Sequence, residues 1–128
     1  MSIQVLKIVS SAMTELGIEY GFVSYSGNPI VYPYAVGEYQ ETEPVTEDGL
    51  IEGTFTLTLF HRGEWLDLER AKEKIERYFN QVSGKTVITD NGSGVAIFYA
   101  GSMIVPTGDA ELKRLQINLS INEWKVTI

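Results

Sequence analysis

The fold of this chain is decided between residues 33 and 79, where the sequence reads PYAVGEYQETEPVTEDGLIEGTFTLTLFHRGEWLDLERAKEKIERYF. Residues 53–59 (GTFTLTL) alternate threonine with large apolar side chains, which is typical of a strand with one buried face. In residues 66–79 the apolar side chains recur at helical spacing among charged ones. A half-buried strand followed by an amphipathic helix favours an antiparallel sheet with a helix packed on one side.

The residues before this strand predict a second strand and an acidic connection. Residues 34–40 (YAVGEYQ) are rich in aromatic and small apolar side chains, so we expect a strand there. Residues 41–49 (ETEPVTEDG) carry many acids and few apolar side chains. Such a segment cannot bury enough apolar surface to pack, and we expect an exposed, mobile loop.

Two helices are expected, each with its own boundary residues. Ser2 is expected to cap the first helix, and Gly17 to end it in the left-handed conformation. Asp67 is expected to cap the second helix, which Gly84 would end. The predicted buried stripes are Val5, Val9, Met13 and Leu16 in the first helix, and Leu68, Ala71, Ile75 and Tyr78 or Phe79 in the second.

The remaining strands follow from alternation and turn residues. Residues 86–89 and 95–99 flank DNGSG, a strong hairpin signal because Asn-Gly tolerates positive φ. Residues 115–121 alternate apolar and polar side chains, and the apolar positions then change parity at Trp124. We therefore expect a bulge or turn near residues 122–123. One core is expected to join Val9, Leu57, Ile75, Ile117 and Leu119.

The 128 residues are expected to form a single domain, residues 1–128, of the α+β class. Its predicted architecture is a mostly antiparallel β-sheet with two α-helices packed on one face. The chain has no cysteine and no apolar run long enough to cross a membrane, and its start does not resemble a signal peptide. We therefore expect an intracellular protein that does not associate with membranes.

The net charge of −7 is unevenly distributed. No lysine or arginine lies between Lys7 and Arg62, a stretch that contains eight acids, whereas nine bases balance nine acids from Arg62 onward. Tight binding of nucleic acid needs clustered basic side chains, so this distribution argues against it. The acidic first half either keeps the protein soluble or forms a functional negative field.

No arrangement of residues predicts a catalytic, metal or cofactor site. His61 is the only histidine, and no nucleophile or orienting acid stands at a motif spacing from it, so a surface histidine at a strand end is favoured over a general base. Gly84-Lys85-Thr86 lacks the earlier glycine of a phosphate-binding loop. The acids of residues 38–52 do not have the spacing of a calcium loop, which favours a solvated loop over a cation site.

Tyrosine is concentrated in residues 20–39, and this side chain suits both a core and an interface. The candidate contacts with another subunit or a partner are Tyr25, Tyr32, Tyr34 and Tyr39. The candidate acidic docking residues are Glu38, Glu41, Glu43, Glu47, Asp48 and Glu52.

Residues 33–79 resemble the tail terminator and tail-completion (head–tail joining) proteins of long-tailed bacteriophages. The resemblance lies in PYAV followed by GEY, the acidic loop, the 53–59 strand and the helix that begins LDLERA. A preceding helix and a closing strand that ends near Glu123 extend it over nearly the whole chain. The shared features are the order of elements and their rough patterning, without an invariant motif.

The resemblance implies a structural protein of a phage or prophage virion, assembled in the host cytoplasm, without enzymatic activity or cofactor. Such proteins form a ring, commonly a hexamer, that caps the tail tube, ends its polymerisation and meets the head–tail connector protein. DNA would pass through the lumen of the ring as cargo without being bound, and the candidate acids named above could line that lumen. Two alternatives stay open: another connector or minor tail protein, and a small ligand-binding or enzyme domain unrelated to phages.

Overall fold

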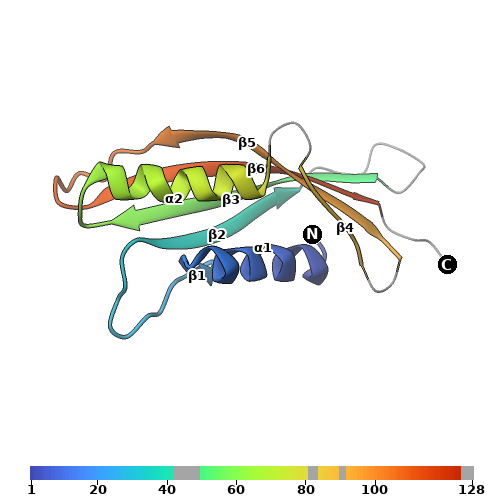
Figure 1. The fold of residues 1–128 in the computed structure, drawn as a ribbon, viewed down its shortest axis with the longest axis horizontal. Helices are drawn as coiled ribbons and strands as arrows, with labels where there is room; N and C mark the ends of the chain where they lie inside the picture. The colour runs from blue at the N-terminus through green and yellow to red at the C-terminus, as the bar shows by residue number, and fades with distance from the viewer. Residues whose placement is uncertain (42–49, 81–83, 90–91, 125–128) are drawn as a thin grey trace.

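The computed structural model describes residues 1–41, 50–80, 84–89 and 92–124 (Figure 1). Within them the chain forms two helices and six strands. Their order is α1 (Ile3–Leu16), β1 (Glu19–Phe22), β2 (Tyr34–Glu41), β3 (Leu50–His61), α2 (Trp65–Tyr78), β4 (Lys85–Ile88), β5 (Gly94–Ile104) and β6 (Lys113–Trp124).

The strands form one curled sheet in the order β1-β2-β3-β6-β5-β4. β1 pairs with β2 in parallel, and every other pair is antiparallel. Figure 1 shows α2 lying along β3 and β6, while α1 runs beside β1 and β2. The predicted α+β class, with a mostly antiparallel sheet and both helices on one face, is therefore confirmed.

The helices cover the face of the sheet on which the large apolar side chains lie. In the register of β3 with β6, Leu57 stands opposite Ile117 and Phe55 opposite Leu119, and all four are fully buried. Val9 of α1 and Ile75 of α2 complete the same cluster, as predicted. We call this side the covered face, and the opposite side, on which no described helix lies, the open face.

The first helix has both predicted boundaries, but the second has neither. The Ser2 hydroxyl accepts a hydrogen bond from the Val5 amide at 3.3 Å, and Gly17 has φ 72°. The cap position of α2 is Glu64, which makes no side-chain capping bond, so Asp67 lies inside the first turn instead. The helix ends at Tyr78, well before Gly84. Its predicted stripe is confirmed, with Phe79 buried and Tyr78 only partly so.

The bulge predicted near residues 122–123 is wrong. β6 pairs with β3 without interruption to Trp124, so the parity of residues 115–121 continues to Glu123. Glu123 is buried on the covered face, where its carboxylate accepts a hydrogen bond from the Ser2 amide at 3.3 Å, and Trp124 turns to the open face. The irregularity lies in β5 instead, between Tyr99 and Ser102, where Gly101 has φ 114°.

The predicted strands are present, and β2 and β3 are longer than predicted. β2 continues to Glu41 and β3 already begins at Leu50, so the acidic connection is shorter than its sequence suggested. The predicted hairpin is confirmed by the antiparallel pairing of β4 with β5. Residues 90 and 91 of its turn lie outside the described residues.

Candidate functional site

Three of the four candidate tyrosines meet at one end of the sheet, around Tyr34 and Phe60 of the open face. Tyr34 of β2 stands opposite Phe60 of β3, and their ring centroids are 5.2 Å apart. The ring of Tyr25 stacks on that of Tyr34 at 4.5 Å, and Tyr32 lies 5.6 Å from Tyr34. We call these four side chains the aromatic cluster: Tyr25, Tyr32, Tyr34 and Phe60. Each is only partly buried, so the cluster packs against itself and still presents its rings to solvent.

Tyr39 does not join this cluster. It stands opposite Phe55 and so belongs to the covered face. Its ring stacks on Phe22 at 6.1 Å, and 42% of the residue is exposed. The sequence placed the four tyrosines in one candidate group because they are close along the chain, but strand alternation separates Tyr39 from the others.

An arginine borders the aromatic cluster. A hydrogen bond to Tyr32 raises the pKa of Arg62, and Asp109 raises it further. Partial burial raises the pKa of Tyr34, and Tyr32 adds to this effect while Arg62 opposes it. Tyrosine and arginine are the side chains most enriched at the centres of protein interfaces, so this end of the open face has the composition of a contact surface.

The candidate acids are not one loop. Glu38 and Glu41 belong to β2, and Glu52 belongs to β3. Glu38 stands opposite Thr56 on the open face, and Glu52 stands opposite Asn122 on that face. The carboxylate of Glu41 pairs with the amino group of Met1. Glu43, Glu47 and Asp48 lie outside the described residues, so the expected acidic lumen or docking loop is placed only at its two ends.

The centre of the open face carries uncharged polar side chains. Asn118 accepts hydrogen bonds at 3.3 Å from the hydroxyl of Thr56 on the neighbouring strand and from the amide of Gln116 on its own strand. The threonines of β3 and the amides of β6 therefore form a polar surface between the aromatic cluster and the acids. Neutral polar side chains cost less free energy to remove from water than charged ones, so such a surface can form hydrogen bonds with a partner.

His61 is not the surface histidine that its sequence context favoured. It continues the buried parity of Phe55, Leu57 and Leu59, is only 8% exposed, and its Nε2 lies 3.0 Å from the Asp67 carboxylate. Its Nδ1 has no partner among the described residues. We assign the tautomer with the proton on Nε2, so that Nε2–H donates to the Asp67 carboxylate. Burying the unprotonated Nδ1 without a partner costs less free energy than burying an N–H without an acceptor. The parity of β3 was the sequence signal for this burial.

A pocket of about 380 Å³ opens beside His61, between α2 and the segments that flank β1. Its charged and polar lining residues are Glu19, Tyr32, His61, Asp67, Arg70 and Lys74. Among the described residues that line it there is no serine, threonine or cysteine that the His61–Asp67 pair could activate. The arrangement suits recognition of a polar ligand better than acyl-transfer chemistry.

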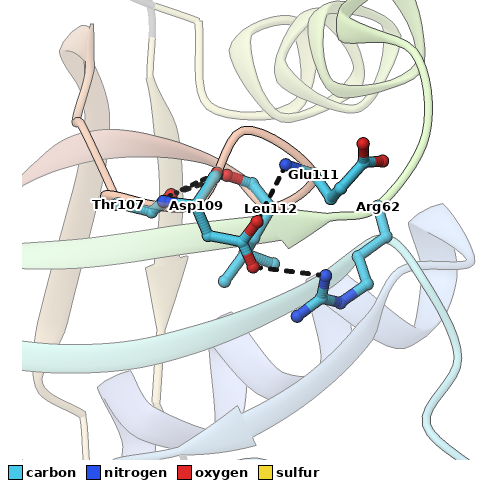
Figure 2. Close-up of polar contacts among 5 residues, drawn as sticks. All are labelled: Arg62, Thr107, Asp109, Glu111 and Leu112. Atoms are coloured by element: carbon cyan, nitrogen blue, oxygen red, sulfur yellow. Dashed lines mark hydrogen bonds and ion pairs between the residues drawn. The ribbon is translucent and has the colours of Figure 1, made fainter.

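The loop between β5 and β6 is a structured element that the sequence did not reveal (Figure 2). The Thr107 hydroxyl donates to the carbonyl of Leu112 at 2.8 Å and accepts from the Asp109 amide at 3.1 Å. The Asp109 carboxylate accepts from the Glu111 amide at 2.9 Å and from Arg62 at 3.4 Å. Arg62 thus ties this loop to the end of β3 that carries the aromatic cluster.

Two further structural observations and two comparisons with known proteins complete the description of the candidate site. Among the described residues, no three carboxylate, histidine or cysteine side chains come close enough to hold a metal ion. None of the described helices has the length and apolar character that crossing a membrane requires. No protein-family model and no curated protein matches the chain, so the resemblance to phage tail proteins rests on the sequence pattern alone.

Proposed function

We propose that the chain is a structural virion protein of a phage or prophage that forms a ring, caps the tail tube and joins the tail to the head connector. The observation that carries this proposal is the aromatic cluster beside Arg62 on the open face. The resemblance of the sequence pattern to tail terminator proteins also supports it. A subunit of a closed ring needs two complementary patches, and the aromatic cluster is suited to be one of them.

The acids of β2 and β3 have a second role in this proposal. Glu38 and Glu52 lie on the open face, away from the helices. Turned toward the lumen of a ring, such carboxylates repel DNA phosphates and keep the duplex from adhering as it passes. Replacing Glu38 and Glu52 by lysine should then slow DNA passage in assembled particles, most strongly at low salt, without preventing folding.

Sedimentation velocity over a range of protein concentrations, with and without purified tail tubes, tests the assembly. The expected result is a closed oligomer, commonly a hexamer for the resembled family, that forms alone or on the tubes. Tyr34→Ser should shift the equilibrium toward monomer, and Tyr39→Ser serves as its matched control outside the cluster. A strict monomer that ignores tail tubes would falsify the proposal.

The length of tails separates a terminator from another connector or minor tail protein. Particles made without this protein are expected to carry over-long tails in electron micrographs. Tails of normal length that lack heads would instead assign the protein to the head–tail connection.

A second candidate function is ligand binding in the pocket beside His61. The buried His61–Asp67 pair and the two basic side chains of α2, Arg70 and Lys74, favour it. Calorimetric titration with small dicarboxylates and phosphate esters tests this candidate. Heat of binding that disappears in Arg70→Ala, in a protein that remains monomeric, would favour it over the ring.

A further inference from the structure

A second pocket lies where β5 turns into β6, away from His61. Its volume is about 330 Å³, at the small end of the range for ligand pockets. One wall is apolar and is built from Trp65 at the start of α2 and from Ile104, Val105 and Pro106 at the end of β5. Trp65 is 38% exposed and Ile104 is 59% exposed, so both present apolar surface to solvent.

The opposite wall is the loop drawn in Figure 2, and its shape is fixed by hydrogen bonds. The Thr107 hydroxyl forms hydrogen bonds with the backbone of Asp109 and with the carbonyl of Leu112. The Arg114 guanidinium donates to the carbonyl of Pro106 at 3.3 Å. A wall held in this way needs no ordering when a ligand arrives, which lowers the entropic cost of binding.

The charge of the pocket is positive. Lys113 and Arg114 line it, and no acid among the described residues pairs with either. Asp109 is the one acid in the lining, and its carboxylate is already occupied by Arg62 and by the Glu111 amide. Glu64 and Glu111 are neighbours in sequence of lining residues, but neither lines the pocket. In Figure 2 the side chain of Glu111 extends away from Asp109.

A free strand edge borders the same pocket. β4 pairs with β5 only as far as Ile97, and the Tyr99 amide bonds to the Phe79 carbonyl at 2.6 Å. Beyond this point no described strand pairs with the outer edge of residues 101–104. Met103 and Ile104 are 55% and 59% exposed. Unpaired strand edges are the sites at which extended peptides add to a sheet.

We propose that this edge and pocket bind an extended acidic segment of a partner protein. The segment pairs its backbone with residues 101–104 of β5, places one large apolar side chain between Trp65 and Ile104, and sets a carboxylate near Lys113 and Arg114. Backbone pairing supplies affinity, while the apolar pocket and the two cations select the sequence. The pocket adjoins the aromatic cluster, because Arg114 stands opposite Phe60 in the pairing of β6 with β3. None of the four cluster residues lines it, and the proposal does not depend on ring formation.

Selection from a displayed library of random peptides against the intact protein tests the site. The peptides enriched are expected to combine a large apolar residue with neighbouring aspartate or glutamate. One of them, synthesised with a fluorescent label, should bind at least about tenfold more weakly to Arg114→Glu and to Ile104→Asp, a change of about 1.4 kcal/mol or more. Its affinity should also fall with rising salt.

Matched controls separate the site from general effects of charge and folding. Lys74→Glu reverses a charge on α2, and Ile88→Asp places a carboxylate on another exposed isoleucine, so both should bind the peptide as the unaltered protein does. Hydrogen exchange should slow at the amides of residues 101–104 when the peptide binds. A selection without acidic peptides, or peptides that bind Arg114→Glu and Ile104→Asp with full affinity, would overturn the proposal.

Discussion

The two faces of the sheet are built from the same strands but carry different kinds of side chain. On β3 and β6 the covered face carries Phe55, Leu57, Ile117 and Leu119, all without exposed surface. The open face of the same strands carries threonine, asparagine, glutamine and serine between the aromatic cluster and the acids. Because successive side chains of a strand point to opposite sides, each face can be changed with little effect on the other.

This comparison indicates where the stability of the domain resides. Apolar burial dominates folding, so the covered face holds the domain together. The hydrogen bonds of the open face are partly hydrated and contribute little individually. Substitutions on the covered face should therefore change the free energy of unfolding, and those on the open face should mainly change binding. Four measurements test this division.

The largest effect is expected from Ile117→Ala, at the centre of the covered face. The lost transfer energy and the remaining cavity should lower the free energy of unfolding by about 2–5 kcal/mol. Gln116→Ala, the adjacent open-face position, should cost less than about 1 kcal/mol. Urea denaturation of both variants measures the contrast, and equal losses would show that the faces are not energetically distinct.

The second effect is the alkaline loss of stability caused by Tyr20. Burial raises the pKa of Tyr20 from 10.0 to about 12, and its hydroxyl has no partner among the described residues. Between these values the unfolded chain gives up the tyrosine proton and the folded protein keeps it, so stability falls as pH rises from 10.0 to about 12.

The size of this loss follows from the shift, which corresponds to about 2–3 kcal/mol. Tyr20→Phe should remove that part of the alkaline decline and leave stability below pH 10.0 nearly unchanged. Urea unfolding of both proteins across this pH range measures the difference. Parallel pH profiles would contradict the burial of the hydroxyl.

A smaller effect is expected where α1 begins to cover the sheet. Ser2→Ala removes the hydroxyl that accepts from the Val5 amide and should cost about 1 kcal/mol. Ser2→Asp, which keeps a capping oxygen, is the matched control and should retain most of the stability. Thermal unfolding followed by circular dichroism compares them, and an undiminished melting temperature in Ser2→Ala would show that the cap is dispensable.

The smallest effect is expected from Thr56→Val on the open face. The substitution keeps the side-chain shape and removes one hydrogen bond to Asn118, which also accepts from Gln116. The cost should be at most about 1 kcal/mol, because the site is partly hydrated. A loss as large as that of Ile117→Ala in the same urea experiment would mean that the open face also carries the fold.

The candidate site was only partly accessible from the sequence. Tyrosine enrichment identified Tyr25, Tyr32 and Tyr34, but proximity along the chain could not exclude Tyr39, which alternation places on the other face. The pairing of His61 with Asp67 was missed because the end of β3 and the first turn of α2 converge only when the helix folds back over the sheet. The pocket beside Trp65 is lined by residues from α2, β5, β6 and the loop between these strands, so no local sequence pattern predicts it.

Most helices and strands, and the side of each that is buried, were predictable from the sequence. Period-two and helical spacing of apolar residues act locally, and they placed both helices, the main strands and the core around Leu57 and Ile117. The face of the sheet on which Glu123 lies was not predictable in this way and depends on strand pairing. Trp124 made the sequence favour a break in the strand, but uninterrupted pairing with β3 continued the ladder and buried the carboxylate against the Ser2 amide. The physical reason is that backbone pairing along a whole strand outweighs the preference of one or two side chains at its end.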